Sequence, residues 1–364
     1  MAAIVEDFNA VGFNQLRRLL PIHWASNQAV LVLGPPGCGK TAFAQSEGPD
    51  LIAECLGADR EACGESVALA AGMDAFDWRG IPSRRPDGST SASWPTMFPT
   101  DAGIEAGRFP KHGLLILDEI DKAAPEGLAP LHQFLLQQQF GDYRLPAGWR
   151  ILATGNRMKD SAGGRRLGTA LSDRLATYTL NATFDGWEPW ARQAKIHSQI
   201  MTFHRFKHGQ SFYRFDPSSD KNATARGWEM LSRNLHLLDG AKAPDSDYYA
   251  CAISWVGKEI GAEFNSFRGI FRELPDIKQI CKDPDSVPVP DPKRTDLAIA
   301  LASILAVASA KENLGNVISY VRRLPEEIQS VYRKDVIVAL KKVAEQHPAM
   351  IKLVADNPGL AEIE

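Results

Sequence analysis

Short, mainly hydrophobic runs occur in the first half of the chain, at 29–33, 67–71, 114–117, 150–154 and 176–180, and the run at 114–117 is continuously apolar. Runs of this length are typical of parallel strands that are buried on both faces. Stretches with helical periodicity lie between them, at 10–25, from residue 41 onward and at 125–138. Strands that alternate with helices at this rhythm predict an α/β fold with a doubly wound parallel sheet of five strands.

The second half of the chain has a different pattern. After Asp185 helical periodicity dominates, and aromatic and basic residues become more frequent. The segment DPDSVPVPDPKR at 283–294 is rich in proline and aspartate, which predicts a linker. We therefore expect an α/β domain at 1–185, a helical domain at 186–282, the linker at 283–294 and a further helical unit at 295–364. The apolar run at 297–310 is too short to span a bilayer and predicts a buried helix.

Two segments of the α/β domain interrupt the alternation. The first is the segment at 81–101, IPSRRPDGSTSASWPTMFPTD, which is too long for an ordinary connection in a compact domain. We interpret 82–101 as an insertion or a working loop, and disorder is the alternative. QFGDYRLPAGW, at 139–149, has glycine near both ends and resembles a hairpin.

Composition places the chain among ordinary globular proteins. Its 364 residues are 44% hydrophobic and 23% charged, and its net charge of −3 provides no general attraction to nucleic acid or to an anionic membrane. The five cysteines show no C-x-x-C pairing, which suits a reducing compartment. The first residues lack the features of a secretory signal. These observations predict a cytoplasmic protein without a membrane partner.

The stretch LVLGPPGCGKT places two prolines and three glycines directly after the run at 29–33. The spacing Gly34-x-x-x-x-Gly39-Lys40-Thr41 fits a phosphate-binding loop, in which backbone N–H groups converge on an anion. Lys40 then reaches the β- and γ-phosphates, and the Thr41 hydroxyl is a ligand for Mg²⁺. A glycine-rich turn that matches by chance is the alternative, but the motif lies between a predicted strand and a predicted helix, whose dipole favours an anion. The predicted nucleotide-binding residues of this loop are Gly34, Pro35, Pro36, Gly37, Cys38, Gly39, Lys40 and Thr41.

Polar residues follow the predicted strands at 114–117 and 150–154. Asp118 and Glu119 follow the run at 114–117, where the carboxyl ends of parallel strands face a ligand crevice. Asp118 is predicted to hold Mg²⁺ and Glu119 to polarise the attacking water; solvated charges at a strand end are the alternative. Asn156 ends the run at 150–154 and can orient water or sense a γ-phosphate, whereas an asparagine that favours a turn is the structural alternative.

Four arginines are candidates for a further role. Arg174 precedes the run at 176–180 and can be presented to the γ-phosphate of a neighbouring subunit, or can form a salt bridge with a surface acid. Arg165 and Arg166 are rival candidates. Arg226 begins a predicted helix, where a cation is unfavourable to the helix dipole, which suggests a ligand.

The motifs LVLGPPGCGKT, LLILDEIDKA, ATGNR, ALSDRL and TARGWEML, in this order, resemble those of MoxR-like AAA+ ATPases. The resemblance implies an αβα nucleotide domain, a helical lid and a ring, usually a hexamer, that uses ATP and Mg²⁺. It also implies that Gly34 to Thr41 form Walker A, Asp118 and Glu119 Walker B, Asn156 sensor 1, Arg174 the arginine finger and Arg226 sensor 2. Ala225 stands where many relatives have proline.

Three classes of function follow. The first is an ATP-driven chaperone-like hydrolase that remodels or activates a protein partner; MoxR-like proteins commonly work with a von Willebrand factor A domain protein. The second is a nucleic-acid motor related to McrB, which uses GTP, with Arg84, Arg85, Trp94 and Lys111 as a local basic and aromatic surface. The acidic balance argues against it. The third is a nucleotide-gated switch, against which the acidic pair and the finger candidate argue.

Overall fold

The computed structural model describes residues 10–140, 142–157, 160, 175–216, 218–291, 293–309, 312–340 and 348–356. The chain forms two compact units. The first extends to Trp187 and includes two short later segments, Phe215–Asp220 and Thr224–Arg226, and the second contains the rest of the chain.

The first unit is built on a parallel sheet of six strands, in the order β1-β10-β2-β9-β6-β3. Their bounds are β1 Ala10–Val11, β2 Val30–Leu33, β3 Cys63–Leu69, β6 His112–Asp118, β9 Trp149–Gly155 and β10 Ala176–Leu180. The central strands are mainly apolar and buried, and Leu114 to Leu117 of β6 are completely inaccessible. The predicted doubly wound α/β fold is confirmed.

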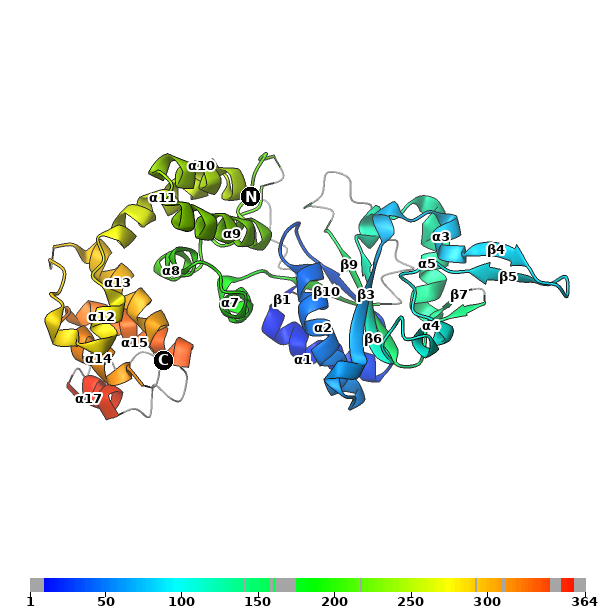
Figure 1. Cartoon of the computed structure of the whole chain (residues 1–364), viewed down its shortest axis with the longest axis horizontal. Helices are drawn as coiled ribbons and strands as arrows, with labels where there is room; N and C mark the ends of the chain where they lie inside the picture. Colours follow the sequence, from blue (N-terminus) through cyan, green and yellow to red (C-terminus); the bar gives the residue numbers. More distant parts are fainter. Residues whose placement is uncertain are drawn as a thin grey trace, which may run out of the picture. The chain divides into compact units, whose positions relative to one another are not determined.

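Helices cover both faces of this sheet (Figure 1). One face packs against α2 (Lys40–Leu56), beside which lies α1 (Phe13–Ala25). On the other face α5 (Pro125–Gln137) shares a core with β6 and β9. Alternate side chains of each strand serve the two faces, since successive residues of a strand point in opposite directions. The sheet is therefore the middle layer of three.

The sheet differs from the predicted one at its edges. The sixth strand, β1, was not expected: it has two residues, of which Val11 is buried and aligned with Leu180 of β10. A two-residue strand is too short to show a pattern in sequence, and the neighbouring strand determines its conformation. β3 begins at Cys63, four residues before the predicted run, because the whole of it pairs with β6.

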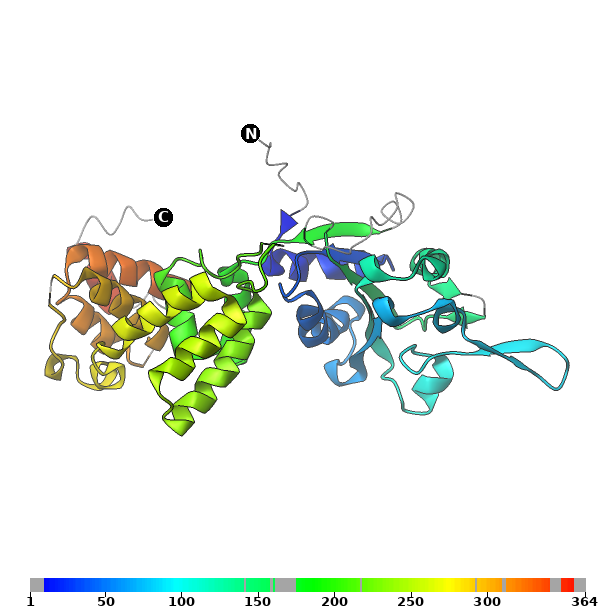
Figure 2. The same ribbon diagram turned by 90° about the horizontal axis from the view of Figure 1, so that it is seen from above.

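The two interrupting segments form antiparallel hairpins. β4 (Ile81–Arg84) pairs with β5 (Thr90–Ser93), and Figure 2 shows this hairpin projecting from the sheet unit. β7 (Gln139–Phe140) pairs with β8 (Tyr143–Arg144), as the hairpin-like sequence predicted. The short helices α3 (Ala75–Arg79) and α4 (Asp101–Glu105) flank the longer hairpin. The first segment is thus a structured insertion.

The described residues after β10 form mainly helices, as predicted. These helices are α7 Phe184–Gln193, α8 Ser198–Phe206, α9 Ala225–Ala241, α10 Asp245–Val256, α11 Lys258–Arg272, α12 Ile277–Lys282, α13 Thr295–Ala308, α14 Leu314–Val321, α15 Glu326–Leu340 and α17 Pro348–Asp356. Single 3₁₀ turns occur at Arg60–Ala62, Ala70–Gly72, Ile120–Lys122 and Pro284–Ser286. Within the described residues, no helix has both the length and the apolar character that a membrane span requires.

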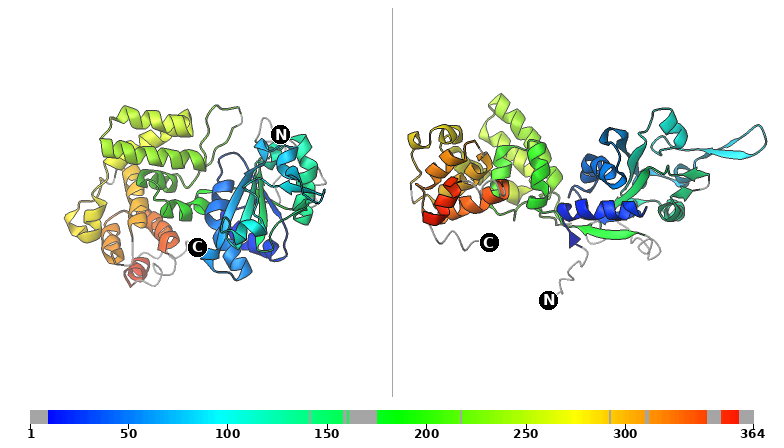
Figure 3. Two further views of the ribbon diagram at one scale, coloured as in Figure 1. Left: turned by 45° about the vertical axis from the view of Figure 1, so that its right-hand side comes forward. Right: turned by 90° about the horizontal axis from the view of Figure 1, so that it is seen from below.

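One hydrophobic core joins the helices from α12 to α17, drawn in yellow to red in Figure 3. The predicted buried helix at 297–310 is α13, whose Leu301 and Leu305 are inaccessible. Val287, within the predicted linker at 283–294, contributes to the same core. The boundaries at 185, 282 and 294 remain predictions.

Candidate functional site

The glycine-rich loop follows β2 and leads into α2, which begins at Lys40. Gly37 and Gly39 have φ angles of 70° and 101°, in the region that favours glycine. A Cβ atom at Gly37 would lie 2.9 Å from Oγ1 of Thr224, a residue of the same unit. Both glycines are therefore required by the path of the backbone, which curls at the N-terminus of α2.

β2 is the strand at which the winding of the sheet reverses. The helix after β2, α2, leads to β3 at the far edge of the sheet, whereas the strands next to β2 in the sheet are β9 and β10. In open α/β sheets, ligands bind beyond the carboxyl ends of the strands at such a reversal. The loop lies at this position, next to the ends of β9 and β6.

Lys40 connects the loop to the next strand. Its Nζ atom donates to the carbonyl oxygens of Gly34 at 2.8 Å and Pro35 at 3.1 Å, and to Oδ1 of Asn156 at 3.2 Å. Two parts of the predicted site, which are 116 residues apart in sequence, are thus in direct contact. The ammonium group lies where a phosphate on the loop would meet it.

Thr41 and Asp118 form the second contact between predicted site residues. The Thr41 hydroxyl lies 2.9 Å from each oxygen of the Asp118 carboxylate, at the end of β6. The hydroxyl of Thr154, on β9, also donates to Asp118. A hydroxyl and a carboxylate are hard oxygen donors of the kind that Mg²⁺ prefers.

This donor set is small, which also fits Mg²⁺. In the part of the chain that the structure describes, no group of three or more His, Cys, Asp or Glu residues could hold a metal ion. Mg²⁺ is usually bound by one or two protein oxygens together with water and substrate phosphates, rather than by a cage of side chains. Thr41 and Asp118 are suited to that form of binding.

Glu119 directly follows β6 and has a left-handed backbone conformation, with φ of 55° and ψ of 43°. A non-glycine residue in this region is uncommon and often marks a functional site. The carboxylate forms an ion pair with Lys122 at 3.0 Å, and the side chain is about one-third exposed, at 37%. The Glu119 side chain is therefore accessible to water, and the backbone turns at this residue, directly after Asp118.

Asn156 lies at the end of β9 and contacts a residue that the sequence analysis did not single out. Oδ1 of Asp121 accepts from the Asn156 backbone N–H at 2.9 Å, and Oδ2 accepts from the Asn156 side-chain amide at 3.3 Å. Asp121 is 1% exposed. The stretch LDEIDK contains this third carboxylate three residues after Asp118, which was the available signal.

The arginine candidates are only partly described. The backbone N–H of Arg226, in the first turn of α9, donates to the Gly37 carbonyl at 3.1 Å, and the Arg226 side chain is exposed. Arg174, Arg165 and Arg166 lie outside the described residues. The loop is therefore in contact with the backbone at Arg226, and the roles of all four side chains remain predictions.

Cys38, inside the loop, is completely buried. Burial raises the pKa of its thiol, although the neighbouring Lys40 partly opposes this effect. The reactive form of cysteine is the thiolate, and both burial and a raised pKa suppress it. These properties indicate that the Cys38 thiol is unreactive.

The chain was compared with known proteins. No protein-family model matches it, and no curated protein matches it. Among solved structures it is similar to the RuvB Holliday junction branch migration motor of Thermotoga maritima, with 14% identity over 74% of each chain and a TM-score of 0.36. It is also similar to a DNA polymerase III gamma subunit-related protein of Thermotoga maritima, with 12% identity over 94% of this chain and 97% of the other, and a TM-score of 0.35. Scores this low establish neither fold nor function, so the site rests on its own geometry.

Proposed function

We propose that the chain is an ATPase of the AAA+ class, MoxR-like in type, which hydrolyses ATP to ADP and phosphate. The observation that carries this proposal is the contact of Lys40 with Asn156 and of Thr41 with Asp118 at one edge of the sheet. These four side chains come from the loop and from two different strands. The order of the strands in the sheet provides further support, because it brings β2, β9 and β6 side by side.

In the proposed reaction, the loop N–H groups and Lys40 bind the phosphates of ATP. Thr41 and Asp118 would hold Mg²⁺, and the ion would supply positive charge near the phosphate oxygens. Glu119 accepts a proton from the water that attacks the γ-phosphorus, and the bond to the ADP oxygen breaks. Asn156 orients this water. Arg226, as sensor 2, and Arg174 of a neighbouring subunit add positive charge in the transition state.

Nucleotide binding tests the first part of this proposal. Lys40→Ala is expected to abolish binding of a fluorescent ATP analogue, because it removes the cation from the loop. Lys122→Ala is a matched control, since Lys122 is on the same edge but contacts Glu119. Equal binding by Lys40→Ala and the wild type would contradict the assignment of the loop.

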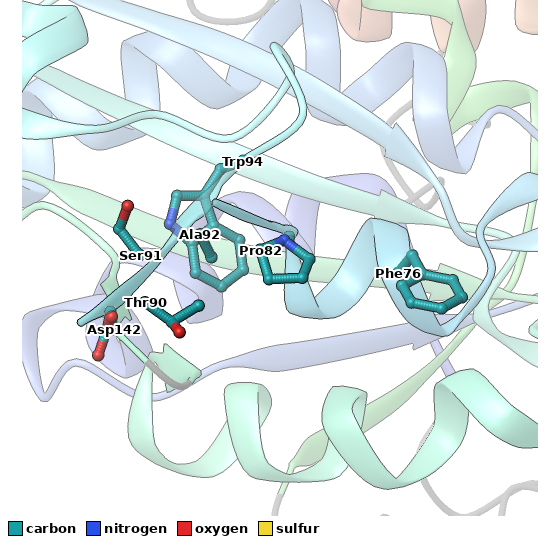
Figure 4. A pocket seen from close by; sticks show the side chains of 8 residues that line it. Phe76, Pro82, Thr90, Ser91, Ala92, Trp94 and Asp142 are labelled. Atoms are coloured by element: carbon teal, nitrogen blue, oxygen red, sulfur yellow. The ribbon is translucent and has the colours of Figure 1, made fainter. Parts of the chain in front are cut away.

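We propose further that the partner is a protein, contacted through the two hairpins. A pocket of about 380 Å³ lies at the base of the β4–β5 hairpin, between α3 and the turn that follows β7. Figure 4 shows Trp94 and Pro82 of the hairpin region with Asp142 and, farther along, Phe76. The Phe76 side chain is 67% exposed. Apolar walls beside one carboxylate suit an extended client segment that carries a bulky apolar side chain next to a lysine or arginine.

Charge reversal tests this client site. Asp142→Lys is expected to weaken binding of a fluorescent peptide that contains Phe-Lys pairs and to improve binding of the same peptide with Phe-Glu pairs. Asp87→Lys, at the exposed tip of the same hairpin, is the control. Identical preferences in all three proteins would show that the pocket does not recognise the client.

We include in this proposal a cytoplasmic homo-oligomeric ring, a hexamer, with a von Willebrand factor A domain protein as one candidate partner. A McrB-like nucleic-acid motor that uses GTP is the second candidate. Arg84 and Arg85 are exposed on the hairpin and favour it. Trp94, however, packs against Tyr143 at 5.0 Å and is half-buried, so it is poorly placed to stack on bases. Tight DNA binding that weakens steeply with salt would favour the motor.

A further inference from the structure

The buried carboxylate of Asp121 has no place in the reaction described above. It lies in the 3₁₀ turn Ile120–Lys122, directly after the acidic pair, and is 1% exposed. A buried carboxylate is costly unless several donors satisfy it. Asn156 donates to it twice, from its backbone N–H and from its side-chain amide. Asp121 therefore holds Asn156 at two points.

The contacts of Asn156 fix the orientation of its amide. Lys40 can only donate a hydrogen bond, and an ionised carboxylate can only accept one. The side-chain oxygen must therefore face Lys40, at 3.2 Å, and the nitrogen must face Asp121, at 3.3 Å. The usual ambiguity between the oxygen and the nitrogen of an asparagine does not arise here. The amide bridges a cation and an anion, which polarise it in the same direction.

The end of β9 leaves room for this arrangement. A Cβ atom at Gly155 would lie 3.1 Å from Oδ1 of Asp121 and 3.2 Å from Cδ2 of Leu33. Both contacts are tighter than ordinary packing allows, so a side chain there would push against Asp121. The absence of a side chain at Gly155 is thus what lets the carboxylate approach the backbone of Asn156.

From these contacts we infer that Asp121 is a positioning residue that holds the side-chain oxygen of Asn156 toward Lys40 and the phosphate side of the loop. The inference rests on the proposed ATPase function. It assigns to Asn156 the role of an acceptor: its oxygen faces the reaction and can accept a hydrogen bond from the attacking water. In this role Asp121, which is 1% exposed, acts through Asn156.

A double-mutant cycle tests whether Asp121 acts through Asn156. Asp121→Asn conserves shape but replaces one acceptor with a donor. It is expected to lower kcat by about tenfold, while the Kd for ATP changes by less than about threefold. Outer-shell residues that orient the ligands of a metal typically cost about 10- to 100-fold in activity or affinity when they are replaced, and we expect a similar effect for a residue that orients Asn156. Asn156→Ala is expected to lower kcat similarly, and the double variant no further. Gly155→Ala, which displaces Asp121 without changing its charge, is expected to behave as Asp121→Asn does. Additive losses in the double variant, or equal losses in kcat and in ATP affinity, would overturn the inference.

A spectroscopic measurement tests the positioning itself and does not need turnover. The side-chain amide protons of Asn156 are expected to exchange slowly in ¹⁵N-labelled protein, and Asp121→Asn is expected to accelerate their exchange by at least about tenfold, since a hydrogen bond to a charged acceptor is lost. Unchanged exchange would overturn the inference. Accelerated exchange in a protein without any ATPase activity would instead refute the proposed function and leave the positioning contact established.

Discussion

At the scale of single residues, the candidate site depends on contacts between side chains that are far apart in sequence. Lys40, Thr41, Asp118 and Asn156 follow from loop spacing and from strand ends, and the structure brings them together. Thr154 and Asp121 were missed because their contacts with Asp118 and Asn156 depend on which strands are neighbours. Strand order is a tertiary property that no local pattern carries.

Gly37 gives a prediction at this scale. Gly37→Ala is expected to weaken ATP binding by at least about tenfold, because it adds left-handed strain of about 1–2 kcal/mol and a contact with Thr224. Gly88→Ala is the matched control: Gly88 has φ of 84°, but its Cβ would meet nothing within 4 Å. Both variants are titrated with a fluorescent nucleotide. Gly37→Ala introduces left-handed strain together with the contact with Thr224, whereas Gly88→Ala introduces left-handed strain alone. Similar affinity losses in the two variants would exclude a specific role for Gly37.

His204 predicts a dependence of stability on pH. It is completely buried among the rings of Phe203, Phe212 and Trp228, and burial lowers its pKa to about 3. The unfolded chain binds a proton near pH 6.5, so the contribution is complete above that pH and is lost as pH falls toward 3. The free energy of unfolding is expected to be about 2 kcal/mol lower at pH 5 than at pH 7.5 from this group alone. Urea titrations at both pH values should show a smaller decrease for His204→Phe; an equal decrease would refute the assignment.

At the scale of elements, runs of four or more apolar residues predicted β2 and β6, because strands that are buried on both faces require such runs. The short edge strand β1 and the first half of β3 were not predictable in this way. Cys63 to Ser66 alternate poorly in polarity, and pairing with β6 determines their conformation. The sequence of the segment at 82–101 is compatible with an insertion and with disorder. The backbone pairing between Ile81–Arg84 and Thr90–Ser93 shows that it is a structured insertion.

The β4–β5 hairpin yields the prediction at this scale. Arg84 pairs directly with Thr90, so replacing Arg85–Ser89 by Asn-Gly should close the hairpin with a tight two-residue turn. Basal ATP hydrolysis is expected to persist, whereas capture of a protein client by a Glu119→Gln variant is expected to fall.

Hydrogen exchange of 82–101 and 139–149 with and without ATP should show that both hairpins respond to nucleotide. If exchange is unaffected and capture survives the replacement, the hairpins are not working loops.

At the scale of the whole molecule, the sequence predicted a sheet domain followed by helices, and the structure agrees on that order. Because Arg174 is proposed to act on the nucleotide of a neighbouring subunit, specific ATPase activity is expected to rise with protein concentration. Mixing Arg174→Ala with Lys40→Ala should restore part of the activity, since some interfaces then pair an intact loop with an intact arginine. If dilution and mixing have no effect, the finger lies elsewhere, and Arg165 and Arg166 are the next candidates.

The proposed reaction requires Glu119 to activate water at a site where Lys40 and Thr41 bind ATP. The most direct measurement compares ATP binding with phosphate release in the wild type and in Glu119→Gln, in which the carboxylate is replaced by an amide of the same shape. We expect Glu119→Gln to bind ATP with unchanged affinity but to release phosphate at least about a hundredfold more slowly, the lower range of a general base. Equal rates of phosphate release from the two proteins would contradict the account.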